Sequence, residues 1–310
     1  MRQAVKIFSY ALLLFIVVAI GCYLLSPSFF SVGDSSVAAA DKNRSGAAGT
    51  PLVAVDATVY RGLMQMLGVG DRCIDFSNEM KPDAEKVIAS GADMLMLSMY
   101  EGRDTSVYSR MGIKIVACHD FMELSPLGRA RWMKRYGRMW GVGERADSLY
   151  EVVEKNYRML SSMSKNEKVR PRVFFDLMYG NLWYQPSEKS SMGALVIDAG
   201  GALPFHIVQD GGSKALSREQ VLSGAKDADV WIIRYQGRKK LTLSDLKALD
   251  PVYSQFRAFI NGNVWACNTD ETAYFDEAPF RPDYQLEDII SILHPKLKHK
   301  KQLHYFSRVE

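Results

Sequence analysis

The chain has 310 residues, 47% of them hydrophobic and 24% charged, with a formal net charge of +4 at pH 7. This length and balance are typical of a globular protein with room for two modest domains. The positive charge is dispersed, without the basic stripe interleaved with aromatics that is typical of nucleic-acid binders, so we expect no nucleic-acid partner. The basic stretch near the end, "KLKHKKQLHYFSR", is expected to be a solvated chain end.

The chain begins with a basic segment and the apolar run "IFSYALLLFIVVAIGCYLLSPSFF", which is long enough to enter a membrane. Three interpretations stay open: "VAIGC" offers Cys22 for lipidation, "VAAAD" offers cleavage after Ala40, and the run could remain as an uncleaved anchor. All three predict that the remainder of the chain is exported. The small polar residues after the run predict a flexible tether, so residues 1–49 are assigned to signal or anchor plus tether.

From residue 50, short apolar runs alternate with helical patterns. Because strands that alternate with helices and are apolar throughout indicate a mostly parallel sheet covered on both faces, residues 50–141 are assigned to an N-terminal α/β lobe. Strands are predicted at "PLVAVD", "CIDFS", "ADMLMLSM" and "IKIVACH". Helices are predicted at "ATVYRGLMQMLGVGDR", "DAEKVIASG", "TSVYSRMG" and "SPLGRARWMKRYGRMWG", the last with Ser125 as its N-cap and Pro126 at its first position.

A long helical pattern, "ERADSLYEVVEKNYRMLSSMSK", comes next, and residues 142–168 are assigned to a connecting helix. The alternation then restarts, which predicts a C-terminal α/β lobe over residues 169–310. Its predicted strands are "VFFDLMYG", "DADVWIIRY" and "NVWACN". Its predicted helices are "SSMGALVIDAGG", "REQVLSGA", "TLSDLKALDPVYSQFRAFING" and "PDYQLEDIISILHPKL".

One phrase occurs twice in the chain. "EKVIASGADMLML", from Glu85, and "EQVLSGAKDADVWII", from Glu219, each run from a glutamate through a short helical pattern to Ala, Asp and an apolar strand. We interpret them as the same βαβ element, one in each lobe.

This organisation resembles the helical-backbone solute-binding proteins of bacterial ABC importers, in particular the group common in Bacteroides-type bacteria. The resemblance covers residues 51–297 and rests on "ELSPLGRARWMKRYGRMWG", "VIDAGG", "LSREQVL…DADVWII" and "RPDYQLEDIISILHPKL". It implies a class III periplasmic-binding-protein-like fold, in which one long backbone helix joins two lobes, each with a central, mostly parallel sheet flanked by helices. It also implies a monomer, tethered at the periplasmic face of the cell envelope, that captures an iron chelate (siderophore or haem) or cobalamin between its lobes. The partners would be an inner-membrane ABC permease and its ATPase.

In such proteins the ligand meets loops at the C-terminal ends of the strands. Aromatic rings there would offer flat apolar surface to a macrocycle, and arginines would meet carboxylate or catecholate groups, which favours an anionic iron chelate or haem. The candidate ligand contacts are Tyr60, Met99, Tyr100, His119 and Phe121 in the first lobe and Trp183, Tyr184, Arg234, Tyr235, Tyr274 and Phe275 in the second.

Several of these residues have a structural interpretation as well. Tyr60 at a helix start suits the core, Trp183 suits a packed loop as well as a cleft, and methionines such as Met99 usually fill core gaps. His119 could be an axial ligand of haem iron, although a lone histidine at a strand end is more often a hydrogen-bonded neighbour.

Members of the resembled family carry one exposed glutamate on each lobe, which pairs with permease arginines. The motif match nominates Glu219 and, in "MYEGRD", Glu101, whereas the internal repeat nominates Glu85 as the counterpart of Glu219. The structural alternative is a solvated glutamate favoured by the dipole at a helix start.

Neither an enzyme nor a resident cofactor is expected, because no G-x-S-x-G, P-loop or H-E-x-x-H motif occurs. Two alternatives remain, an exported chelatase-like enzyme on a related two-lobe fold, with His119 and a carboxylate as metal ligands, and an exported protein that binds zinc or manganese directly. Five histidines are a thin supply of metal ligands, and the cysteines other than Cys22 lack C-x-x-C spacing, which argues against a zinc site or a disulfide framework.

Overall fold

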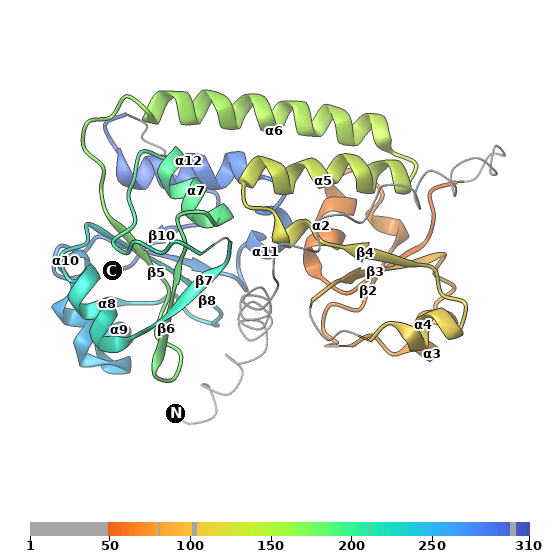
Figure 1. The fold of residues 1–310 in the computed structure, drawn as a ribbon, viewed down its shortest axis with the longest axis horizontal. Helices are drawn as coiled ribbons and strands as arrows, with labels where there is room; N and C mark the ends of the chain where they lie inside the picture. The colour runs from red at the N-terminus through yellow and green to blue at the C-terminus, as the bar shows by residue number, and fades with distance from the viewer. Residues whose placement is uncertain (1–48, 80, 101–103, 210, 298–301) are drawn as a thin grey trace. The chain divides into compact units, whose positions relative to one another are not determined.

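The computed structural model describes residues 49–310 except residues 80, 101–103, 210 and 298–301 (Figure 1). The chain folds into two compact units. Unit 1 comprises the described residues up to His119 together with Arg135–Ala146, and unit 2 comprises Asp120–Lys134 and Asp147–Glu310. Cys22 and Glu101 lie outside the described residues. Within the described part, no helix is both long and apolar enough to span a membrane.

Unit 1 contains a four-stranded parallel sheet in the order β2-β1-β3-β4. The predicted alternation of strands and helices is confirmed here. The strands are β1 (Val53–Val55), β2 (Cys73–Asp75), β3 (Met94–Ser98) and β4 (Ile115–Cys118). The helices are α2 (Thr58–Met66), η2 (Gly70–Arg72), α3 (Ala84–Ala89), α4 (Ser106–Arg110) and, directly after β4, η3 (Asp120–Met122), which belongs to unit 2.

Both faces of the unit 1 sheet are apolar. Successive side chains of a strand point to opposite sides of the sheet, so a strand made of consecutive apolar residues contributes to both faces. On β1, Ala54 belongs to one buried cluster, while Val53 and Val55 are fully buried on the other face. The cluster consists of Ala54, Phe76, Val87, Leu95, Leu97 and Tyr108. This is why the strands read as continuous apolar runs.

Two helices contribute residues to both units: α5 (Pro126–Met139) and the 22-residue α6 (Gly143–Ser164), which is the expected long backbone helix. The predicted cap of α5 is confirmed, since the backbone N–H of Gly128 donates to Ser125 Oγ at 3.0 Å. After α5, Gly141 adopts φ of 76°, the left-handed conformation that terminates helices and that glycine reaches without steric cost.

The main sheet of unit 2 has the order β10-β9-β8-β5. Three strands are parallel, β5 (Val173–Phe175), β8 (Val230–Tyr235) and β9 (Val264–Asn268), and β10 (Ser307–Arg308) runs antiparallel to β9. Figure 1 shows α7 (Ser191–Asp198) and α12 (Pro282–Leu293) on one side of this sheet and α8 (Arg218–Ala225), α9 (Leu243–Leu249) and α10 (Arg257–Ile260) on the other. The short helices η4 (Pro251–Gln255) and α11 (Tyr274–Glu277) complete the unit, with an antiparallel pair formed by β6 (Leu182–Pro186) and β7 (Ser213–Ser217).

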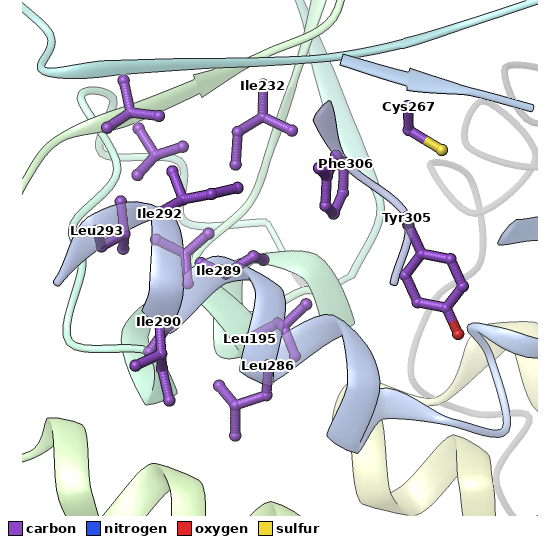
Figure 2. Packing of buried hydrophobic residues seen from close by; sticks show 14 of the residues in the cluster. Leu195, Ile232, Cys267, Leu286, Ile289, Ile290, Ile292, Leu293, Tyr305 and Phe306 are labelled. Carbon is purple, nitrogen blue, oxygen red and sulfur yellow. The ribbon is translucent and has the colours of Figure 1, made fainter. Parts of the chain in front are cut away.

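Alternate residues of β5 and β8 supply two separate cores. Val173, Phe175 and Ile232 pack toward α7 and α12, where Figure 2 shows Leu195, Leu286 and Ile289 among the aliphatic side chains of the cluster. On the opposite face, Phe174 and Trp231 stack with ring centroids 5.1 Å apart, and Phe174 also stacks on Phe256 at 4.9 Å. The period of two along each strand therefore places a mixed aliphatic and aromatic core on one face and an aromatic layer on the other.

Two predicted elements of unit 2 are wrong in extent. The strand predicted over residues 173–180 ends at Phe175, and the antiparallel pair formed by β6 and β7 was not predicted. The helix predicted over residues 242–262 is broken into α9, η4 and α10, because Pro251 has no N–H to donate and the Asp250 side chain caps the next segment instead.

The prediction of a solvated chain end is also wrong for the described residues after the gap at 298–301. Tyr305, Phe306 and Val309 are buried, and β10 adds a strand to the sheet. The fully buried Asp288 anchors this segment, because its two carboxylate oxygens accept the backbone N–H groups of His304 and Tyr305, each at 2.8 Å. The high density of charged residues in the sequence therefore concealed a segment whose apolar side chains are buried.

Candidate functional site at the carboxyl edges of the two sheets

The carboxyl ends of the parallel strands form one edge of each sheet, and open α/β sheets bind their ligands at this edge. In unit 1 the residues at these ends include Asp56 after β1, Asp75 in β2, Ser98 in β3 and His119 after β4. In unit 2 the corresponding residues are Asp176 after β5, Arg234 in β8 and Asn268 in β9. Polar side chains therefore line both edges.

Asp56 joins two strand ends in unit 1. Its carboxylate accepts the backbone N–H of Ser98 at 3.1 and 3.0 Å and the Ser98 hydroxyl at 3.2 Å, and the side chain is only 8% exposed. The Tyr60 hydroxyl lies 3.5 Å from the same Ser98 hydroxyl. These bonds hold the end of β3 against the end of β1.

Asp75 is paired with a cation at the same edge. Arg61 Nη1 lies 2.5 Å from Asp75 Oδ2, and both side chains are partly exposed. Burial acts to raise the pKa of the Asp75 carboxyl, but hydrogen bonds from Ser77 and the charge of Arg61 outweigh it, so the pKa falls below its usual value. The carboxylate stays ionised at neutral pH.

Asp176 joins the strand ends of unit 2 in the same way. It is the one non-glycine residue of the described chain with positive φ, at 57°. Its Oδ1 accepts the backbone N–H and the Nε–H of Arg234, each at 3.0 Å, and its Oδ2 accepts from Arg234 Nη2. The result is a bidentate ion pair between side chains that are 19% and 16% exposed, for Arg234 and Asp176 respectively.

The pKa of the Arg234 guanidinium reflects two opposed effects. Burial acts to lower it, whereas the neighbouring Asp176 carboxylate and Tyr274 raise it, and the net pKa lies above its usual value. Arg234 is therefore a permanent cation whose charge Asp176 compensates.

The repeated phrase occupies equivalent places in the two units. Val53, at the start of β1, pairs with Met94, and Val173, at the start of β5, pairs with Val230, so the two strand pairs share one register. The aspartate that precedes each second strand accepts the backbone N–H of the residue before the first strand: Asp93 accepts from Leu52 at 2.7 Å and Asp229 from Arg172 at 2.8 Å. This correspondence aligns Ser98 with Arg234 and Asp56 with Asp176.

Four of the predicted ligand contacts are buried in the interior, which argues against exposed aromatic walls at these positions. Trp183 is fully buried, and its indole Nε1–H donates to the carbonyls of Phe175 and Asp176 at 2.8 and 3.1 Å. The four side chains and their exposures are Tyr60 at 1%, Trp183 at 0%, Tyr235 at 8% and Tyr274 at 5%. Their large apolar area is used in packing, and each hydroxyl or indole has a partner inside the protein.

The remaining predicted contacts retain some exposure. His119 is exposed at the end of β4, and those that are partly buried are Met99, Tyr100, Phe121, Tyr184, Arg234 and Phe275. Tyr274 interacts with Arg234, and Phe275 lies edge-on to Tyr274 with ring centroids 5.5 Å apart. In unit 2 the structure therefore gathers Asp176, Arg234, Tyr274 and Phe275 at one place.

Sequence reasoning missed Asp56 and Asp176. A signal was available, because each aspartate directly succeeds the short apolar run that begins its lobe, in "VAVD" and "VFFD". A carboxylate at the end of a parallel strand can accept the N–H that the neighbouring strand end leaves unpaired. Reading strand ends for aromatic and cationic residues alone overlooked this role.

The predicted docking residue Glu219 is exposed in the first turn of α8. Its backbone N–H and the Ser217 hydroxyl, which donates to Glu219 Oε2 at 2.8 Å, lower the pKa of the Glu219 carboxyl. Glu85 occupies the matching position in unit 1. It is exposed and is the second residue of α3, two positions after the N-cap residue Asp83. Both glutamates therefore precede equivalent strands.

A separate hollow of about 420 Å³ lies in unit 2, where none of the predicted contacts is found. Its lining includes Glu123 and Arg131 from the α5 region, Tyr150 and Tyr157 from α6, and Asp198 from α7. The Tyr157 hydroxyl donates to Asp198 Oδ2 at 2.7 Å, so this part of the hollow is occupied by an internal bond. Among the described residues, no group of three or more His, Cys, Asp or Glu side chains is placed to hold a metal ion.

Two curated relatives of this chain are uncharacterised lipoproteins of Methanocaldococcus jannaschii. One is 27% identical over 254 residues, covering 80% of this chain and 58% of the relative. The other is 22% identical over 227 residues, covering 69% of this chain and 55% of the relative. The chain thus spans less than three fifths of the length of these curated relatives.

Solved structures share the fold at low sequence identity. A periplasmic haem-binding protein from Pseudomonas aeruginosa superposes with a TM-score of 0.67 at 14% identity, covering 84% of this chain and 98% of that one. The haem-binding protein RhuT from Roseiflexus sp. RS-1 gives 0.64 at 15% identity, with 81% and 100% covered. An ABC-type Fe³⁺-hydroxamate transport protein from Saccharomonospora viridis gives 0.60 at 17% identity, with 79% and 94% covered.

A family model described as periplasmic binding protein matches residues 42–271, well over half of the chain, from the end of the predicted tether to the segment after β9. Together with the two α/β units and the long backbone helix, this match identifies the family. The chain belongs to the periplasmic binding protein family.

Proposed function

We propose that this protein is the substrate-binding component of an ABC importer and that it binds an iron chelate, haem or cobalamin at the carboxyl edges of its sheets. The family match carries the proposal. It is supported by the polar residues and partly exposed aromatics gathered at the carboxyl edge of unit 2. The proposed activity is capture and delivery, in which no bond is made or broken.

The charges at this edge do not favour any one of siderophore, haem and cobalamin over the others. Arg234, one of the arginines that favoured an anionic ligand, already carries its counter-charge on Asp176. It therefore lends no support to an anionic ligand over an uncharged one. His119, exposed at the end of β4, remains the proposed axial ligand if the cargo is haem.

We further propose that the protein is a monomer, exported and tethered at the periplasmic face, where it docks on a permease and its ATPase. The lipoprotein character of the two relatives supports a lipid anchor, for which Cys22 is the candidate. If Cys22 is the lipid site, labelled palmitate will enter the wild-type chain and not the Cys22→Ala variant. Equal labelling of both would refute lipidation and leave an uncleaved helix or cleavage after Ala40.

Docking is assigned to Glu219 on unit 2 and to Glu101 on unit 1. Glu85 is a second candidate for unit 1, because it occupies the same helix position as Glu219. Exposed charges of this kind steer and register a partner more than they add affinity, so their loss should reduce transport rather than ligand binding.

The deciding experiment is a spectral titration of the full chain in detergent with haem, cyanocobalamin and several ferric siderophores. Tight one-to-one binding of one of them is the expected result. For haem, loss of the Soret shift in His119→Ala, with the Tyr184→Phe variant unaffected, would identify the axial ligand. If no chelate binds, while bare zinc or manganese does or a tetrapyrrole is metallated, the protein is an exported metal-binding protein or a chelatase-like enzyme instead.

A further inference from the structure

The carboxyl edge of unit 2 contains a backbone conformation that its counterpart in unit 1 lacks. Asp176 has φ of 57°, which costs free energy for a residue with a Cβ and persists only where its surroundings hold it. Its N–H donates to the Ile232 carbonyl at 2.8 Å. Its own carbonyl accepts the indole N–H groups of Trp183 and Trp231 at 3.1 and 2.9 Å. The main chain of Asp176 is thus held by one hydrogen bond to β8 and by two from indoles of the aromatic layer.

The side chain of Asp176 reaches the neighbouring strand end, where it meets Arg234. The carboxylate contacts the backbone N–H, Nε and Nη2 of Arg234, so both of its oxygens are used. A bidentate pair fixes the plane of the guanidinium as well as its position. Because the two side chains are only 19% and 16% exposed, solvent screens their charges less than at an open surface.

Comparison of the two copies of the internal repeat shows which of these features are needed to join the strand ends and which are not. In unit 1 the equivalent aspartate, Asp56, accepts the backbone N–H of Ser98 at 3.1 and 3.0 Å, which is the same joint between strand ends. That joint uses an ordinary backbone conformation and a serine at the second position. The left-handed turn and the ion pair are therefore additions that unit 2 makes to a joint that works without them.

We propose that Asp176 is a positioning residue that sets the charge preference of the ligand surface on unit 2, by holding the Arg234 guanidinium in place and compensating its charge. The proposal rests on the proposed function. With the Asp176–Arg234 ion pair in place, the edge offers an oriented but charge-balanced group, which suits a ligand whose contacting groups are uncharged. Without that carboxylate, the same guanidinium becomes a net cation and favours a ligand bearing carboxylates or catecholates.

The test compares two ligands that differ mainly in charge. Haem and its dimethyl ester share one macrocycle, and only haem carries two propionate carboxylates. A neutral ferric trihydroxamate and an anionic ferric tricatecholate form a second pair. The measured quantity is the ratio of the dissociation constants of the uncharged and the anionic ligand, obtained by titration of the full chain in detergent.

Asp176→Asn is the main variant, because asparagine tolerates positive φ and keeps one carbonyl oxygen for Arg234. We expect the ratio to shift toward the anionic ligand by about tenfold or more, the size expected for one charge in a partly buried site. In the double variant Asp176→Asn/Arg234→Met the shift should disappear, because the released cation is absent. Asp176→Gly, which also accepts the left-handed conformation, repeats the test if the asparagine variant folds poorly.

The matched control is Asp229→Asn. Asp229 also pairs with an arginine, its Oδ1 lying 2.5 Å from Arg257 Nη2, but it precedes β8 at the opposite edge of the same sheet. Five residues of extended chain separate it from Arg234, about 17 Å, which exceeds the screening length of about 8 Å at physiological salt. The control should leave the ratio of dissociation constants unchanged, although it releases an arginine in the same way.

Three results would overturn the inference. The first is a ratio that stays within about twofold of wild type in Asp176→Asn and Asp176→Gly while both ligands bind. The second is an equal shift in Asp229→Asn, which would mean a general effect of net charge. The third is binding of none of the probes by the wild-type chain, which removes the proposed function and this inference with it. Folding is checked in each variant by thermal unfolding, which a purely structural role of Asp176 would lower without moving the ratio.

Discussion

Replacement of Trp183 tests whether this residue stabilises the core of unit 2 or contacts the ligand. In Trp183→Phe the single indole N–H, which is shared between the carbonyls of Phe175 and Asp176, is lost, but neither carbonyl is left without a donor. Gln185 Nε2 still donates to Phe175 O at 2.7 Å, and Trp231 Nε1 still donates to Asp176 O at 2.9 Å. The cost is therefore the lost hydrogen bonding, about 1 kcal/mol, plus the smaller ring in a site with no exposed surface, about 1 kcal/mol more.

We expect Trp183→Phe to lower the free energy of unfolding by about 2 kcal/mol and Trp183→Ala to lower it by about 3–5 kcal/mol. The assay is urea unfolding followed by circular dichroism, in which only the transition that contains unit 2 should move. Trp265→Phe is the control, since its indole is partly exposed and donates only to Asn263 Oδ1, at 2.9 Å, so it should cost less than 1 kcal/mol, about the value of one hydrogen bond.

Ligand affinity provides the opposing measurement. Because Trp183 is covered on all sides by residues of unit 2, among them Phe174, Tyr253 and Phe256, Trp183→Phe should leave the dissociation constant of the cargo unchanged. An unchanged unfolding midpoint together with clearly weaker ligand binding would refute this reasoning. The ring would then be a ligand contact, which is the alternative that the sequence left open.

Three further outcomes are expected. Burial raises the pKa of the Glu277 carboxyl, so wild-type stability falls as pH rises from the ordinary value through the raised pKa. Glu277→Gln should therefore raise the melting temperature more at pH 7 than at pH 4, and the reverse order would contradict the assignment. Glu219→Ala, alone or with Glu85→Ala, should reduce uptake in cells without changing the affinity of the purified chain; a large loss of affinity would exclude a docking role. Ending the chain at residue 301 removes the buried Tyr305, Phe306 and Val309, each of which contributes on the order of 1.5–3 kcal/mol to stability. Unit 2 should therefore unfold below its wild-type temperature. An unchanged melting temperature would show that this segment only covers the sheet.

The fold class could be read from the sequence because its signals are local. The apolar runs at 53–55, 94–98 and 230–235 predicted strands buried on both faces, and these are β1, β3 and β8. The repeated phrase predicted a duplicated βαβ element, and the two copies share the register of their strand pairs. The cap at Ser125 and the long helix α6 were also evident from residue order alone. Periodicity and capping act over a few residues, so the sequence displays them directly.

Tertiary structure alone decided which of the candidate residues are buried and which stay partly exposed. Trp183 faces the aromatic layer because β6 pairs with β7, about thirty residues further along the chain, and strand pairing determines which alternate side chains are buried. Arg234 is charge-balanced because Asp176, 58 residues earlier, adopts a left-handed turn that no sequence pattern announced. Burial and charge pairing depend on partners distant in the chain, and for that reason the sequence determined the framework while the tertiary structure determined the chemistry of its edge.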